Sequence, residues 1–203
     1  MADALKYRHV DTGAMYRAVA WKALQGGLSF EDEAPVVRLA EQAALDQRDG
    51  RIAIDGRDVT REIRTPEIDK AATAVARLPG VRSVLVDRQR ALGERGGVVM
   101  EGRDIGTVVF PDADVKVYLD ASAEERARRR ASDPAHTGGQ QGSLAGVQSE
   151  LQARDQSDST RAVAPLMIAP DAIYVDTTEM AIAQVVEKVI GIVQQKLQSA
   201  RPG

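Results

Sequence analysis

The chain has 203 residues, of which 43% are hydrophobic and 28% charged, and its formal net charge is −3 at pH 7. These values exclude a disordered chain and fit one globular α/β unit with an additional lobe. The acidic balance disfavours a nucleic-acid partner. With no cysteine, and with His9 and His136 far apart, the sequence offers no disulfide and no zinc site. No apolar run approaches the ~18 residues that cross a bilayer, so we expect no membrane partner and a cytoplasmic protein.

The first thirty residues predict helices. Met1 to Leu5 resembles the last turns of an amphipathic helix, although no cap or breaker precedes it. A second helix follows Asp11 or Thr12, either of which can cap its start, and Gly26-Gly27 ends it. At the other end of the chain, apolar residues at helical spacing between Ile182 and Leu197 predict a long amphipathic helix.

Short β-branched segments alternate with these helical patterns and predict an α/β fold with a mostly parallel sheet. The strand candidates are Val98–Met100, Val115–Leu119 and Ile173–Val175. Each is followed by an acidic residue, namely Glu101, Asp120 or Asp176. The carboxyl ends of parallel strands are where α/β proteins bind ligands. These ends are therefore candidate site positions, although for Asp176 we favour a simple loop start.

A separate lobe is predicted between the helices and the parallel strands. Residues Arg51–Val59 have the pattern of a hairpin with Asp55-Gly56 at its turn. Because this hairpin stands apart from the parallel strands, we assign residues 31–78 to an inserted lobe. The glycines and proline between Asp133 and Gly146 predict a lid near residues 131–150. The core then comprises residues 1–30 and 79–203.

Four clusters could carry chemistry. They are Asp11–Arg17, Glu101–Gly106, Glu124–Arg130 and Arg154–Arg161. The first places a guanidinium one turn into a helix whose N-terminus could bind an anion. The second brackets an Arg-Asp pair with glycines after a strand. The third places arginines on one helical face by their spacing, as a lid that closes on phosphates would require. The fourth places Asp158 between Arg154 and Arg161 on one face, where the carboxylate could accept from a base or sugar while the arginines hold a phosphate. Each also has a simpler interpretation: a capped helix, a structural bridge, a solvated face or a surface ion-pair ladder.

Taken together, the clusters resemble one family, the bacterial cytidylate kinases, from about Leu5 to Leu197. The matching segments are Asp11–Arg17, Asp58–Arg64, Ala72–Ala76, Pro79–Arg82, Gly102–Asp112 and Arg161–Leu166. The Gly102-Arg-Asp and Arg161-Ala-Val-Ala-Pro-Leu segments separate this family from adenylate, guanylate and thymidylate kinases. The resemblance implies a P-loop nucleoside monophosphate kinase core, a monophosphate-binding lobe and a lid.

The resemblance also implies roles for individual residues. Arg17 would lie near the acceptor phosphate, Thr73 would replace a family serine that reads cytosine, and Asp158 would bind the ribose or deoxyribose. The substrate-binding positions it implies are Thr12, Arg17, Thr73, Arg82, Arg103, Asp104, Arg154, Asp158 and Arg161. Arg126 and Arg130 would be catalytic lid arginines. CMP and dCMP would be acceptors and ATP with Mg²⁺ the donor, without a protein metal site, in a monomer.

One element that the resemblance requires is absent from the sequence. No G-x-x-x-x-G-K-[ST] motif, which would hold the donor phosphates, occurs in the 203 residues. We therefore expect an N-terminally truncated kinase whose first strand is absent, so that the strands ending at Met100 and Leu119 present unpaired edges to a gap. A start codon assigned too far downstream, a fragment, and a non-catalytic CMP-binding or regulatory protein are the three explanations. Activity of this chain is accordingly in doubt.

Overall fold

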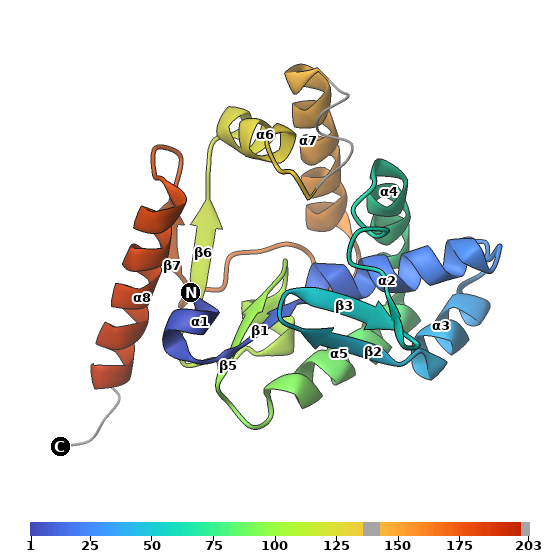
Figure 1. Ribbon diagram of the computed structural model, residues 1–203, viewed down its shortest axis with the longest axis horizontal. Helices are drawn as coiled ribbons and strands as arrows, with labels where there is room; N and C mark the ends of the chain where they lie inside the picture. The colour runs from blue at the N-terminus through green and yellow to red at the C-terminus, as the bar shows by residue number, and fades with distance from the viewer. Residues whose placement is uncertain (136–142, 200–203) are drawn as a thin grey trace.

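The computed structural model describes residues 1–135 and 143–199. Two parallel strand pairs form its centre, and helices surround them (Figure 1). Strand β1 (Arg8–Asp11) pairs with β5 (Val98–Glu101), with His9 opposite Val99. Strand β6 (Val117–Asp120) pairs with β7 (Ile173–Asp176), with Tyr118 opposite Tyr174. The α/β class and the three predicted strands are therefore confirmed.

The beginning of the chain differs from the expectation. The predicted terminal helix is one short helix, α1 (Ala2–Leu5), which ends where Lys6 adopts a left-handed backbone with φ 56°. The following β1 was not predicted, because Arg8, His9 and Asp11 give it no apolar alternation. Pairing with β5 and the complete burial of Val10 determine this strand instead. Tertiary contacts here override local propensity.

A three-stranded antiparallel sheet forms the predicted hairpin region. Its strands are β2 (Leu45–Arg48), β3 (Arg51–Ile54) and β4 (Arg57–Asp58). Asp55 and Gly56 both have positive φ, 50° and 79°, which is the conformation of the tight turn that joins β3 and β4. The hairpin is thus confirmed, and β2 adds a strand that the pattern did not reveal. The side chains of Ile52 and Ile54 are buried in the core.

Helix α2 (Thr12–Gln25) contributes several buried residues to the hydrophobic core cluster. The Asp11 carboxylate caps it by accepting the Ala14 N–H at 2.9 Å, and Gly26 and Gly27 follow its last turn, as predicted. Helix α2 contacts α3 (Glu33–Gln42), α4 (Pro66–Val75) and α5 (Pro79–Gly93), and α3 also packs against α5. A π-helical turn, η1 (Ile105–Val109), follows β5. Burial of the cluster is the main stabilising contribution.

Three more helices complete the fold: α6 (Ala123–Ala131), α7 (Leu144–Thr160) and α8 (Ile182–Ser199). In Figure 1, α6 and α7 lie together at one end of the molecule, and α8 lies beside β7 and β6. Residues Gly138, Gly139 and Gly142 of the predicted lid lie outside the described residues. Within the described ranges, no helix combines the length and apolarity needed to span a membrane.

The two parallel pairs do not join into one sheet. Strands β5 and β6 belong to separate two-stranded sheets, and a cavity of about 1940 Å³ is lined by both, including Val98, Met100 and Val117. Apolar side chains of α8, such as Val185 and Val189, line it as well. Within residues 1–135 and 143–199, the expected gap with unpaired edges is therefore present between these strands, which have not closed on each other.

Candidate functional site

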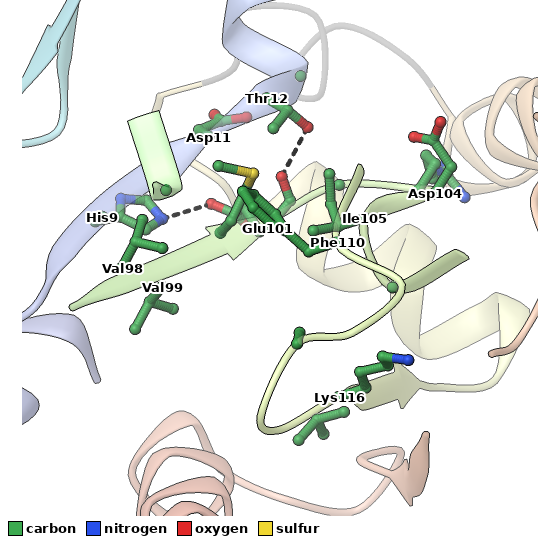
Figure 2. A pocket seen from close by; sticks show the side chains of 18 of the residues that line it. His9, Asp11, Thr12, Val98, Val99, Glu101, Asp104, Ile105, Phe110 and Lys116 are labelled. Atoms are coloured by element: carbon green, nitrogen blue, oxygen red, sulfur yellow. Dashed lines mark hydrogen bonds and ion pairs between the residues drawn. The ribbon is translucent and has the colours of Figure 1, made fainter. Parts of the chain in front are cut away.

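The site begins at the carboxyl ends of β1 and β5. The Thr12 hydroxyl donates to the Glu101 carbonyl at 2.8 Å, and His9 Nε2 lies 2.9 Å from Glu101 Oε1. Figure 2 shows these contacts on one side of the cavity, with Lys116 on another. A Cβ atom at Gly102 would meet the Thr12 hydroxyl, so this close approach requires glycine. The strand ends and the start of α2 are thereby held together.

All nine predicted substrate-binding residues line this same cavity. They are Thr12, Arg17, Thr73, Arg82, Arg103, Asp104, Arg154, Asp158 and Arg161. They come from α2, α4, α5, the segment after β5, α7 and its C-cap, elements that are distant in the sequence. Six of these residues are buried although they are polar or charged, namely Thr12, Arg17, Arg82, Asp104, Asp158 and Arg161. One part of the cavity wall is therefore a cluster of buried polar and charged side chains, whereas the part formed by α8 is apolar.

Asp104, which lines the cavity, lies between two arginines. Arg82 donates to its carboxylate in a short hydrogen bond, and Arg161 Nη2 lies 3.8 Å from Asp104 Oδ2. Their side chains are 3%, 8% and 5% exposed in the order Arg82, Asp104 and Arg161. Burial lowers the pKa of Arg161, and the neighbouring Arg82 lowers it further. The Tyr16 ring lies beside Arg82, and burial raises the pKa of its hydroxyl.

Two carboxylates of α7 continue the network. Asp158 lies 3.5 Å from Arg161 and 3.3 Å from Arg103, and Arg154 lies 3.9 Å away on the preceding turn. Arg103 also contacts Asp155 at 2.8 Å. Charges of opposite sign therefore alternate from α5 to α7, which makes the burial of each charge tolerable.

Arg154 is the most perturbed of these cations. Burial lowers its pKa to about 10, and the positive charges of Arg17 and Arg103 contribute to the decrease. Arg154 therefore remains charged at neutral pH, in surroundings where further positive charge is unfavourable. Such surroundings favour the binding of an anion.

The two predicted catalytic arginines lie at the edge of this cluster. Arg126 Nη1 contacts Asp155 at 2.6 Å, and this hydrogen bond raises the pKa of Arg126. Arg130 donates to Asp69 on α4. Neither arginine lines the large cavity. Both guanidinium groups are held by carboxylates, so the structure shows them beside the site and paired with protein groups.

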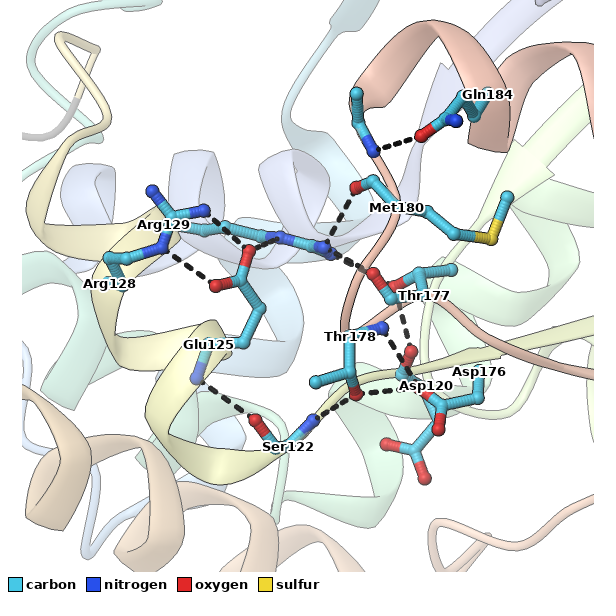
Figure 3. Close-up of polar contacts among 11 residues, drawn as sticks. Asp120, Ser122, Glu125, Arg128, Arg129, Asp176, Thr177, Thr178, Met180 and Gln184 are labelled. Atoms are coloured by element: carbon cyan, nitrogen blue, oxygen red, sulfur yellow. Dashed lines mark hydrogen bonds and ion pairs between the residues drawn. The ribbon is translucent and has the colours of Figure 1, made fainter.

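The adjacent Arg129 was assigned no role from the sequence, where it shares a face with Arg126 and Arg130. In the structure, Arg129 has different partners from Arg126 and Arg130, which contact α7 and α4. It donates to the Thr177 hydroxyl at 2.9 Å and to the Thr177 and Met180 carbonyls, in the segment that follows β7 (Figure 3). Glu125 accepts from Arg128 and Arg129 at 2.7 Å, which lowers the pKa of Glu125 from 4.5 to about 2. The structural interpretation of an arginine run paired with glutamate is correct for these two arginines. Of the two, Arg129 anchors α6 to the segment that follows β7.

Asp176 is likewise structural, as we favoured. Its carboxylate accepts from the Thr178 backbone N–H at 2.8 Å and from the Thr178 hydroxyl at 2.6 Å. Residues that the sequence did not single out are Asp69 and Asp155, which hold Arg130 and Arg126. Their spacing could have pointed to them, because each lies one helical turn before a predicted substrate-binding residue. Asp69 precedes Thr73 by four residues, and Asp155 precedes Asp158 by three.

The fold is of the α/β class, and its cavity is lined in part by arginines. Comparison with known proteins identifies the family. The family model for cytidylate kinase matches residues 1–195, and the chain belongs to this family of nucleoside monophosphate kinases, which are transferases.

Individual relatives agree with this assignment. The chain is 47% identical to a cytidylate kinase of Solibacter usitatus, with 99% of this chain and 87% of the relative aligned. It is 46% identical to a cytidylate kinase of Desulforamulus reducens, over 96% of this chain and 89% of the relative. A bifunctional pantoate ligase/cytidylate kinase of a Synechococcus species is 44% identical, and the chain spans 38% of its length.

Proposed function

We propose that the chain binds CMP and dCMP in the large cavity as acceptors of a phosphoryl group from ATP. The observation that carries this proposal is the convergence of Arg17, Arg154 and Arg161 with Asp104 and Asp158 around one cavity. Guanidinium groups recognise phosphate by charge-assisted hydrogen bonds, and carboxylates accept from sugar hydroxyl and base amino groups. Arg17, Arg154 and Arg161 would then hold the phosphate, and Asp158 would hold the sugar.

Base recognition is assigned to Thr73, Arg82 and Asp104. The Thr73 hydroxyl donates to the Asp69 carbonyl at 2.9 Å, which leaves its oxygen able to accept. Arg82 Nε and Arg161 Nη2 are buried atoms without a hydrogen-bond partner. Buried donors of this kind are rare and costly, and a bound nucleotide would satisfy them. Thr12 and Arg103 would contribute to the same acceptor site.

The proposed reaction is a direct transfer. An oxygen of the acceptor phosphate forms a bond to the γ-phosphorus of ATP, and the bond from that phosphorus to the bridging oxygen breaks, so that ADP leaves. Positioning and electrostatic stabilisation supply the catalysis. Arg126 and Arg130 would stabilise the charge on the transferring group, which requires them to leave the carboxylates of Asp155 and Asp69.

A magnesium ion would accompany the ATP. Across residues 1–135 and 143–199, no three His, Cys, Asp or Glu side chains converge in a way that could hold a metal. We therefore assign no step to a metal held by the described residues. We further propose that the core comprises residues 1–30 and 79–203 with a lid near 131–150, that residues 31–78 form the monophosphate-binding lobe, and that the protein is a cytoplasmic monomer.

Isothermal titration of CMP, dCMP, UMP and cytidine tests the proposal. We expect CMP and dCMP to bind, and Arg17→Met to weaken CMP about 10- to 100-fold, since a charged hydrogen bond contributes about 1.5–3 kcal/mol. Arg38→Met is the matched control, because Arg38 is exposed on α3 and does not line the cavity. Equal loss of affinity in both variants, or no CMP binding by the wild-type chain, would contradict the proposed function.

A second candidate is a non-catalytic CMP-binding or regulatory protein. It is favoured by one observation, the absence of the donor-phosphate motif from the 203 residues. Both candidates require the same acceptor site, so CMP binding does not distinguish them. Measurement of CDP formation from CMP and ATP does.

A further inference from the structure

One carboxylate of α4 is shared by two arginines of two other helices. Arg17 Nε of α2 lies 2.9 Å from Asp69 Oδ1, and Arg130 Nη2 of α6 lies 2.5 Å from Asp69 Oδ2. The side chains of Arg17, Asp69 and Arg130 are 7%, 19% and 22% exposed. Each carboxylate oxygen of Asp69 thus faces a different guanidinium group in a largely buried position. Three helices that are distant in sequence meet at this one residue.

The surroundings of Asp69 are strongly positive. Burial lowers the pKa of Arg130, the charge of Asp69 opposes this decrease, and Arg17 and Arg64 add to it. Asp69 also opposes the decrease in the pKa of Arg154. Without a negative charge here, several guanidinium groups would repel one another in a region of reduced solvent access. Asp69 therefore acts as a counter-ion for the cluster.

A phosphate group offers the same recognition elements as this carboxylate. Its terminal oxygens can accept from two guanidinium groups at once, and it carries more negative charge than a carboxylate. The phosphate of an acceptor nucleotide and the carboxylate of Asp69 cannot both occupy the position between Arg17 and Arg130, and two anions there would repel each other. A phosphate that binds Arg17 and Arg130 together must consequently displace Asp69 from both arginines.

We propose that Asp69 is an internal counter-ion that fills the anion position between Arg17 and Arg130 and that an incoming phosphate displaces. This inference rests on the proposed function, since it places the acceptor phosphate at Arg17. It also connects two events, because the carboxylate that leaves Arg17 is the one that holds Arg130 on α6. Arrival of the phosphate would thereby release the arginine that acts on the transferring group. Asp69 sets the affinity for phosphate by competing with it.

The test is the affinity of the full chain for inorganic phosphate, which is measured by NMR titration. We expect Asp69→Asn to bind phosphate about tenfold more tightly than the wild type, because the competing charge is removed. Glu67→Gln is the matched control. It removes the same charge from the same helix at an exposed position, and its affinity should stay within about twofold of the wild type because solvent screens it. Unchanged phosphate binding by Asp69→Asn would overturn the proposal. Weaker binding would overturn it as well and would identify Asp69 as a group that orients Arg17.

A second measurement uses the wild-type chain and does not depend on the stability of a variant. Phosphate should shift the Nε–H signals of both Arg17 and Arg130, because both lose the same carboxylate. A shift of the Arg17 signal alone would overturn the displacement. Measurement of both CMP and phosphate binding separates the two proposals. If phosphate binding responds to Asp69→Asn but CMP does not bind, the proposed function fails while the role of Asp69 stands. If CMP binds but Asp69→Asn changes neither CMP nor phosphate affinity, this inference fails alone.

Discussion

Arg82 of α5 and Asp104 after β5 form an ion pair whose side chains are only 3% and 8% exposed. The pair joins the helix that follows α4 to the segment that follows a central strand, and both residues line the cavity. A buried pair of charges has a high desolvation cost, so its value for stability depends on keeping both partners. Its effect on folding can therefore be separated from its effect on binding.

The first prediction follows from this pair. Asp104→Ala leaves the Arg82 charge buried and uncompensated, and we expect it to lower the free energy of unfolding by about 3–5 kcal/mol. The double variant Arg82→Met with Asp104→Leu should be clearly more stable than Asp104→Ala, because it removes both charges. Urea denaturation measures the three unfolding free energies. A double variant that is less stable than Asp104→Ala would show that the charges themselves stabilise the fold.

The second prediction concerns acid stability. The hydrogen bonds from Arg128 and Arg129 lower the pKa of Glu125 from 4.5 to about 2. A folded-state pKa below the unfolded value means that the unfolded chain takes up the proton first as the pH falls. The stabilisation is thus complete above about pH 4.5 and is lost progressively toward pH 2.

Glu125→Gln should consequently be less stable than the wild type at pH 6, and the difference should shrink as the pH falls below 4.5. Thermal unfolding at a series of pH values measures this. Glu124→Gln is the control, since Glu124 is an exposed neighbour on the same helix. A difference between Glu125→Gln and the wild type that stays constant from pH 6 to pH 3 would contradict the assignment.

Much of the fold could be predicted from local patterns. The Asp11 cap, the Gly26-Gly27 stop and the Asp55-Gly56 turn are each encoded by residues within a few positions of one another. Strand β1 could not be predicted, because Val10 is its one buried residue and its pairing partner is some ninety positions away. The motifs of a family resemblance located the cavity residues, since such motifs combine information from the whole chain.

The partners of the site residues were the part that the sequence did not reveal. Ion pairs such as Arg17 with Asp69 and Arg126 with Asp155 join different helices. Residue spacing determines which side chains share a helical face, but it does not determine which other helix that face meets. For this reason Arg126, Arg129 and Arg130, which are close together in sequence, contact three different parts of the molecule.

The third prediction concerns turnover. The chain contains the proposed acceptor residues but no G-x-x-x-x-G-K-[ST] motif. Loss of a single electrostatic group from an active site typically lowers the rate by about 10²–10³, and the motif that would supply several such groups to the donor does not occur in these 203 residues. We expect the 203-residue chain to bind CMP while forming CDP from CMP and ATP at background rates. A coupled assay on a sample whose CMP binding has been verified measures this, and robust CDP formation would show a donor site that we have not recognised.

The last prediction concerns the gap between β5 and β6. Ladder bonds alternate along a parallel strand, and the Arg8 N–H bond to the Gly97 carbonyl sets the phase for β5. The N–H groups of Val98 and Met100 then point away from β1. The hydrogen bond from the Ile173 N–H to the Lys116 carbonyl sets the phase for β6 in the same way. The backbone N–H groups of Val117 and Leu119 therefore point away from β7.

Hydrogen exchange should therefore alternate along both strands. We expect the amides of Val98, Met100 and Leu119 to exchange faster than those of Val99 and Tyr118, which donate within the ladders. The exposed fraction of Leu119, 54%, is consistent with an open edge at β6. Exchange measured by NMR residue by residue, below the concentration at which the chain associates, provides the values. Equal protection on both sides of β5 and β6 would mean that another strand fills the gap in solution, because unpaired strand edges readily accept one.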